Sequence, residues 1–146
     1  MSTSALPTWF IWAALSALFA AFTAIFAKIG LEGVDSDLAT LVRTVVIVAV
    51  LAAFVYFTGK WQNPLTLAPR TLLFLALSAL ATGASWVCYF RALKIGEAAK
   101  VAPVDKFSVV LVAILAFAIL GERPTGGQWF GILLVGAGVV SLAIFR

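Results

Sequence analysis

The chain has 146 residues, of which 64% are hydrophobic and only 11% are charged. Soluble globular domains average roughly 45–50% apolar and about 25% charged residues, so this composition excludes an ordinary soluble fold and a disordered chain. The sequence has no His and a single Cys, Cys88, which excludes a His/Cys zinc site, a Cys–His nucleophile pair and an intramolecular disulfide. The basic residues are scattered between apolar segments, a pattern typical of membrane proteins and not of nucleic-acid binding.

Several apolar segments are long enough to cross the hydrocarbon core of a membrane, which takes about 20 residues of α-helix. Five such spans are predicted, at residues 9–27, 38–57, 71–90, 101–120 and 128–145. The loops between them are too short to fold as domains, so residues 1–146 are predicted to form one bundle, an all-α membrane protein. No basic residue precedes the first span, so we expect an uncleaved helix there and not a signal peptide.

The basic residues give only a weak preference for one orientation in the membrane. Helix count places Lys60, Arg70 and Arg123 on the face of the N-terminus, and the other basic residues on the opposite face: Lys28, Arg43, Arg91, Lys94, Lys100, Lys106 and Arg146. Arg43, Lys100 and Lys106 are expected inside helices and are poor orientation signals, which leaves the two faces nearly balanced. Dual topology is therefore open, and two oppositely inserted copies would have the symmetry of inverted-repeat transporters.

Small residues form a stripe along the last predicted helix. Gly127 and Gly131 are four residues apart, Gly138 follows seven residues later, and Ser141 extends the same face. Such a stripe lets another helix backbone approach closely in lipid, where no hydrophobic force drives helices together. We expect this face to be a homodimer contact, with packing inside one chain as the alternative.

Charged side chains occur inside the predicted spans, where each costs about 2.5–3.5 kcal/mol on insertion scales and usually serves function or finds a partner. Arg43 lies about 9 Å inside the second predicted helix, at 1.5 Å per residue. Asp105 and Lys106 enter the fourth predicted helix from the same face. The depths match, so the sequence allows an Arg43–Asp105 ion pair.

The third predicted helix brings Trp86, Tyr89 and Arg91 toward that same face, and Trp86 and Tyr89 are three residues apart on one side of it. One interpretation is a polar substrate and ion pathway in which the cations bind an anionic group. In it, Asp105 carries a coupling proton or orients the cations. The other interpretation is a structural ion pair, with the remaining side chains reaching the lipid headgroups.

Pro103 leaves two possibilities for the fourth predicted helix. If the helix begins near residue 101, Pro103 lies in its first turn, where proline is tolerated. If it begins at Glu97, Pro103 removes a backbone hydrogen bond and interrupts the helix, as is often seen at transporter binding sites.

Motifs of known enzymes are missing from the sequence. Residues 121–127 lack the Lys-Ser/Thr ending of a P-loop, and nothing resembles a nucleophile elbow or a metalloprotease motif. We therefore expect no enzymatic activity, no cofactor and no metal, with proton or ion coupling left open.

Four segments resemble the EamA-type domain of the drug/metabolite transporter superfamily, in its single-domain, five-helix branch. They are TAIFAKIGLEGV (23–34), YFRALKIG (89–96), VAPVDK (101–106) and LGER (120–123). The resemblance implies a secondary transporter or exporter of small metabolites in the inner (plasma) membrane. Larger members fuse two such domains in opposite orientations, so a single domain resembles half of an inverted-repeat transporter and implies an antiparallel homodimer.

The small multidrug resistance branch of that superfamily also pairs antiparallel, through a terminal helix with glycines seven residues apart. Its carboxylate in the first helix has no counterpart here, because residues 9–27 contain no acid, so that mechanism does not carry over. Two alternatives to a metabolite transporter stay open. One is a lipid-linked carrier or flippase, and the other is a non-transporting membrane subunit of a larger complex.

Overall fold

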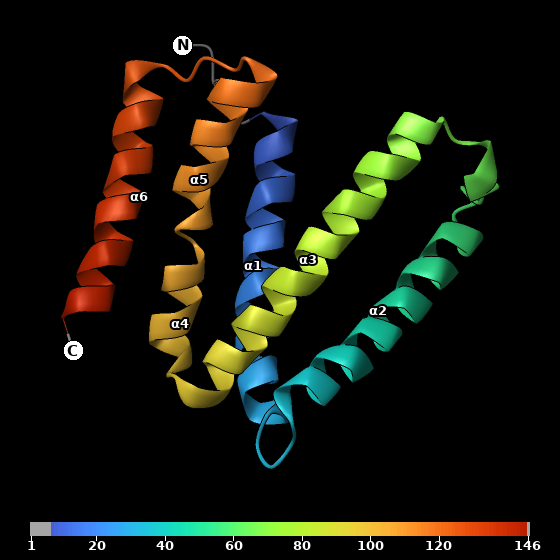
Figure 1. Cartoon of the computed structure of the whole chain (residues 1–146), viewed down its shortest axis with the longest axis horizontal. Coiled ribbons are helices and arrows are strands. Elements are labelled where there is room, and N and C mark those ends of the chain that lie inside the picture. Colours follow the sequence, from blue (N-terminus) through green and yellow to red (C-terminus); the bar gives the residue numbers. More distant parts are fainter. Residues whose placement is uncertain (1–6, 146) are drawn as a thin grey trace, which may run out of the picture. The chain divides into compact units, whose positions relative to one another are not determined.

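A computed structural model describes residues 7–145 of the chain (Figure 1). Residues 1–6 and Arg146, which enter the expectations for the N-terminus and the charge balance, lie outside the described residues. The elements are α1 (Thr8–Gly30), α2 (Ser36–Phe57), the short turn η1 (Pro64–Thr66), α3 (Pro69–Ile95), α4 (Ala98–Asp105), α5 (Ser108–Leu115), the π-helical turn η2 (Ala116–Leu120) and α6 (Gly126–Ile144).

Within residues 7–145, five helical stretches are long and apolar enough to span a membrane, and α4, α5 and η2 together form one of them. The prediction of an all-α protein with five membrane helices is therefore confirmed. The observed bounds differ most at the end of α3, which continues to Ile95, whereas the charge pattern predicts an end at residue 90. The helix continues past residue 90 because the side chains of Arg91 and Lys94 bond to other parts of the chain, Arg91 to Asp37 and Lys94 to the carbonyl of Val34.

The chain divides into two compact units, and the division falls within α1. One unit is Phe26–Ile95, and the other contains α4, α5, η2, α6 and most of α1. The single bundle expected for residues 1–146 stays a prediction.

In the unit Phe26–Ile95, α2 and α3 run antiparallel and are joined by the segment that contains η1 (Figure 1). Helix α2 begins at Asp35, whose carboxylate accepts hydrogen bonds from the backbone N–H of Asp37 (2.9 Å) and Leu38 (3.1 Å). This cap satisfies two of the N–H groups that a helix start leaves without partners inside the helix.

Two lysines tie the end of α3 to the segment before α2. Lys28 Nζ donates to the carbonyl of Leu93 (2.7 Å), and Lys94 Nζ donates to the carbonyl of Val34 (2.8 Å). Leu93, on the last turn of α3, is fully buried, and its carbonyl is one of those that a helix end leaves without a partner inside the helix. The two lysine side chains therefore stabilise this end of the α2–α3 pair by donating hydrogen bonds to backbone carbonyls of the same chain.

In the other unit, Pro103 lies inside α4, which starts after its cap residue Glu97. At residues 106 and 107 the backbone hydrogen bonds connect residues three apart, instead of the four of an α-helix. Lys106 N–H donates to Pro103 O (2.9 Å) and Phe107 N–H donates to Val104 O (3.0 Å). The second of the two possibilities for Pro103 thus describes the structure, because the helix begins at Ala98 and is interrupted before α5.

A tight turn reverses the chain between η2 and α6. Gly121 adopts a left-handed backbone conformation (φ 70°), which glycine reaches without steric cost. Helix α6 then starts with a capping box, in which Thr125 Oγ1 accepts from Gln128 N–H (3.4 Å) and Gln128 Oε1 accepts from Thr125 N–H (2.7 Å). These local signals direct α6 back along α5 and α4, as Figure 1 shows.

Glycines of α6 divide between two faces. Gly136 is buried against α5, and a Cβ built on it would lie 3.0 Å from Val110 Cγ2. A Cβ built on Gly127, Gly131 or Gly138 would meet no described atom within 4 Å. Packing against α5 therefore uses a face of α6 other than the predicted small-residue stripe.

Candidate functional site: a groove with hydroxyl side chains between α2 and α3

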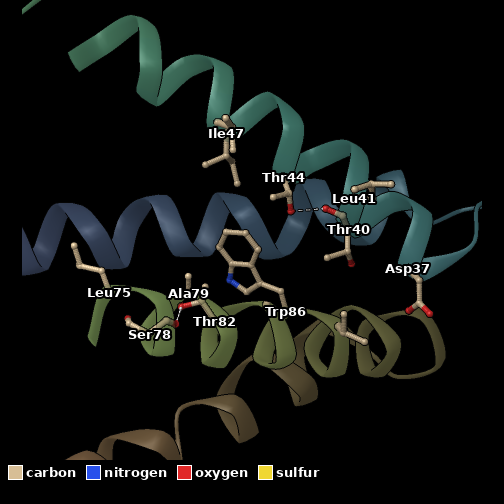
Figure 2. A pocket seen from close by; sticks show the side chains of 13 residues that line it. Asp37, Thr40, Leu41, Thr44, Ile47, Leu75, Ser78, Ala79, Thr82 and Trp86 are labelled. Atoms are coloured by element: carbon tan, nitrogen blue, oxygen red, sulfur yellow. Dashed lines mark hydrogen bonds between the residues drawn. The ribbon is translucent and has the colours of Figure 1, made fainter. Parts of the chain in front are cut away.

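Polar side chains repeat every fourth residue along the facing sides of α2 and α3. Thr40 and Thr44 follow this spacing on α2, and Ser78, Thr82 and Trp86 follow it on α3. A spacing of four keeps side chains on one face of a helix. These residues line a groove of about 620 Å³ between the two helices, and Figure 2 shows them lying along it.

The threonine hydroxyls in the groove donate their protons to their own helices. Thr40 Oγ1 donates to Ser36 O (2.8 Å) and Thr44 Oγ1 donates to Thr40 O (2.7 Å). On α3, Thr82 Oγ1 donates to Ser78 O (2.9 Å). Each hydroxyl oxygen keeps acceptor capacity after its proton is used. The groove therefore offers a row of hydrogen-bond acceptors on an otherwise apolar lining.

An ion pair crosses from α2 to α3 at one end of the groove. Arg91 Nε and Nη2 donate to the two carboxylate oxygens of Asp37, at 3.0 and 2.6 Å. The two-point geometry fixes both side chains more firmly than a single contact would. Arg91, one of the predicted pathway residues, is thus held by Asp37, which also lines the groove.

Arg43 stacks on aromatic rings of α3. Its guanidinium carbon lies 4.3 Å from the ring centroid of Trp86 and 5.0 Å from that of Phe90. Trp86 and Phe90 are four residues apart and so present their rings on one face of α3. The ring of Tyr89 meets that of Phe90 edge-on, with the centroids 6.2 Å apart. Of the predicted pathway residues, the structure brings Arg43 and Trp86 into direct contact.

Asp105 and Lys106 lie at the interruption between α4 and α5. Lys106 Nζ contacts Asp105 Oδ2 at 3.1 Å, so the acid and the base form an ion pair with each other. Arg43 belongs to the other compact unit, and the Arg43–Asp105 pair stays a prediction.

The groove was not predicted from the sequence, although a signal for it exists. Polar residues at Thr40 and Thr44, and again at Ser78 and Thr82, repeat with helical spacing inside apolar spans. Uncharged hydroxyls are common in membrane helices, so this periodicity attracts less notice than the charges do. Asp37 carries no such signal, because nothing in the local sequence indicates its partner 54 residues away.

Metal binding finds no support in the described part of the chain. Among residues 7–145, no group of three or more His, Cys, Asp or Glu side chains is placed to hold a metal ion.

Five apolar helices, two of which carry hydroxyl side chains along a groove, define a multi-pass membrane protein. A model of the EamA-like transporter family matches residues 7–144. The chain therefore belongs to the EamA-like transporter family, as the resemblance of its motifs predicts. It is also 56% identical over 138 residues to a Sinorhizobium sp. protein named "Uncharacterized transporter in cobO 3'region", covering 94% of this chain and 98% of that relative. No solved structure matches the chain.

Proposed function

We propose that the protein is a secondary transporter that moves a small polar metabolite across the inner (plasma) membrane by alternating access. The observation that carries this proposal is the groove between α2 and α3, in which Thr40, Thr44 and Thr82 present hydroxyl oxygens inside membrane-spanning helices. Polar groups in the hydrocarbon region are unfavourable when they face lipid, and they mark the paths of solutes and ions. A polar solute crossing the membrane needs such a row of partners to replace water.

The pathway in this proposal extends from the groove to the charged residues. It includes Trp86, Tyr89 and Arg91 of α3, together with Arg43 of α2. Asp105 and Lys106, at the interruption between α4 and α5, complete it, with Asp105 as the group that carries a coupling proton. Interrupted helices are a frequent feature of transporter binding sites, because they free backbone groups for the solute or ion.

We further propose that the working unit is an antiparallel homodimer joined through α6. The face of Gly127, Gly131 and Gly138 is open in the described chain, whereas Gly136 packs against α5. Ser141 extends the open face toward the end of α6. Two oppositely oriented copies would supply ten helices, with the internal symmetry of inverted-repeat transporters, to enclose a path.

Flux through purified protein in liposomes tests the transport proposal. The liposomes are loaded with a defined mixture of amino acids, amines, nucleosides and organic acids, and mass spectrometry follows what leaves them. Thr44→Val and Thr82→Val remove hydroxyls from the groove without changing side-chain shape much, and both are expected to lower the flux. Asp105→Asn and Arg43→Ala test the charged part of the pathway.

Thr23→Val is the matched control. Thr23 Oγ1 makes the same kind of hydrogen bond, to Phe19 O (2.8 Å), but it lies on α1 and is not among the residues that line the groove. We expect this variant to transport like the wild type. Equal flux in the groove variants, the charged-residue variants and the control would show that the pathway is assigned to the wrong residues. A lipid flipped in place of any soluble compound would favour the flippase alternative.

Cysteine cross-linking tests the homodimer and its direction. In an antiparallel pair centred between Gly131 and Gly138, Gly127 of one copy lies opposite Ser141 of the other, whereas a parallel pair brings Gly127 opposite itself. In a Cys88→Ser background, mixed Gly127→Cys and Ser141→Cys protomers are expected to cross-link. Protomers that all carry Gly127→Cys are not expected to cross-link with one another. Self-linking of Gly127→Cys, or no cross-link in any combination, would contradict the antiparallel arrangement.

A further inference from the structure

We infer that a second hollow in the unit Phe26–Ile95 binds a small organic anion with an apolar body. The hollow has a volume of about 420 Å³, within the range of roughly 300–1,000 Å³ typical of small-molecule sites. The end of α1, helix α2 and Phe90 of α3 contribute its walls, which are apolar apart from one side chain. That side chain belongs to Arg43.

The guanidinium group of Arg43 is only partly satisfied in the protein. Its flat surface stacks on the rings of Trp86 and Phe90, which leaves the N–H groups at its edge to find acceptors. Nη1 is buried and has no hydrogen-bond acceptor among the described residues. A buried charged donor without an acceptor is unfavourable, so an anion that reaches the Arg43 side chain from the hollow is favoured because it compensates this charge.

The lining determines the chemistry of that ligand. A carboxylate or phosphate would match the positive charge of Arg43 and accept its N–H groups at two points. The remainder of the hollow, between residues such as Phe26, Leu38 and Val42, favours an apolar body of limited size. A fully polar anion would leave this apolar surface uncovered, and a neutral apolar molecule would leave the positive charge of Arg43 uncompensated. We therefore infer a free amphipathic anion as the ligand, and the experiment below distinguishes it from an anionic lipid.

This inference rests on the proposed function in one respect, since Arg43 is also a proposed pathway residue. Binding can be measured without transport, so the two proposals fail separately. Intact anion binding by a wild-type protein that transports no compound would contradict only the transport proposal. Measurable flux through a wild-type protein that binds no anion would contradict only this site.

Fluorine NMR on the whole protein in nanodiscs tests the site with three probes of one shape. The probes are para-trifluoromethylbenzoate, its neutral amide, and the cationic para-trifluoromethylbenzylamine, and empty nanodiscs correct for partition into lipid. We expect saturable binding of the benzoate, with the amide and the amine at least about 10-fold weaker, because both lack the charge-assisted contact to Arg43. Acetate, which lacks the apolar body, is expected to compete poorly.

Two variants should weaken benzoate binding by different routes. Arg43→Gln removes the charge, and we expect the benzoate affinity to fall about 10- to 100-fold. Gly30→Leu fills the hollow while leaving Arg43 intact, because a Cβ at Gly30, which lines the hollow, meets no described atom within 4 Å. Arg70→Gln is the matched control, since Arg70 also lies over a ring, that of Phe74 at 5.9 Å, but outside the hollow.

Several results would overturn the inference. Equal affinity for the three probes, or unchanged benzoate binding in both Arg43→Gln and Gly30→Leu, would show that no anion site exists there. Stoichiometric retention of an anionic lipid that only Arg43→Gln and Gly30→Leu release would assign the hollow to lipid and not to a free solute. Gly30→Leu keeps the test decisive if Arg43→Gln fails to fold.

Discussion

The contact between α5 and α6 yields a prediction with a magnitude, because two glycines of one helix differ only in their surroundings. Alanine at Gly136 would place a Cβ 3.0 Å from Val110 Cγ2, whereas alanine at Gly138 meets no described atom within 4 Å. Ordinary carbon–carbon contacts lie at about 3.5–4.0 Å, so Gly136→Ala overlaps by about 0.5 Å or more. Valine in a helix occupies one side-chain rotamer about 90% of the time, so Val110 has little freedom to turn away.

Two opposing effects decide the outcome for Gly136→Ala. Alanine is more favourable than glycine inside a helix by about 0.8–1.0 kcal/mol. Overpacking a well-packed contact costs about 1–3 kcal/mol. The free energy of unfolding is therefore expected to fall by about 0–2 kcal/mol for Gly136→Ala and to rise by up to about 1 kcal/mol for Gly138→Ala, a gap of about 1–3 kcal/mol.

Reversible unfolding in mixed micelles, at protein concentrations where the chain is monomeric, measures this gap. Tryptophan fluorescence is a suitable signal, because Trp129 at the start of α6 contacts Phe117 edge-on, with the ring centroids 6.5 Å apart. A free energy of unfolding for Gly136→Ala that equals or exceeds that of Gly138→Ala would refute the close approach of α5 to Gly136. At higher protein concentrations, Gly138→Ala should weaken the proposed dimer. Gly136→Ala should leave the dimeric fraction of the folded protein unchanged.

Three further predictions concern local contacts. Thr125→Ala removes the cap of α6 and should lower the free energy of unfolding by about 1 kcal/mol. Thr125→Ser keeps the hydroxyl and should retain most of the wild-type stability, so equal losses in the two variants would exclude the capping role. Pro103→Ala restores a backbone N–H, so amide hydrogen exchange in α4 should slow, and an unchanged rate would show that Pro103 does not cause the interruption. Asp37→Arg combined with Arg91→Asp should regain stability lost in either single variant, with a gain that shrinks in high salt; strictly additive effects would contradict the ion pair.

Membrane spans were the most predictable part of the fold. A run of about 20 apolar residues is a local property of the chain, and its length alone decides whether a helix crosses the hydrocarbon core. The charge pattern predicts an end of α3 at residue 90, five residues before the observed end at Ile95. Arg91 continues the helix because Asp37 accepts its N–H groups, and that partner is distant in the sequence.

The candidate site was only partly predictable. Arg43 was singled out as a charge within a membrane span, and the structure places it on the rings of Trp86 and Phe90. Spacing in the sequence pairs Trp86 with Tyr89, but it carries no signal for Phe90 as the second ring beneath Arg43. Spacing identifies which residues share a face, and the facing helix decides which of them make contact.

The amino-acid sequence alone determined the helical class, the number of membrane spans, the family and the presence of charges within the spans. Tertiary structure decided which polar groups meet: the hydroxyl-lined groove of α2 and α3, the Asp37–Arg91 pair, and the hollow beside Arg43. The physical reason is that a helix apolar on all sides carries no strong signal for its rotation about its own axis. That rotation is set by contacts between helices, and those contacts form only when the chain is folded.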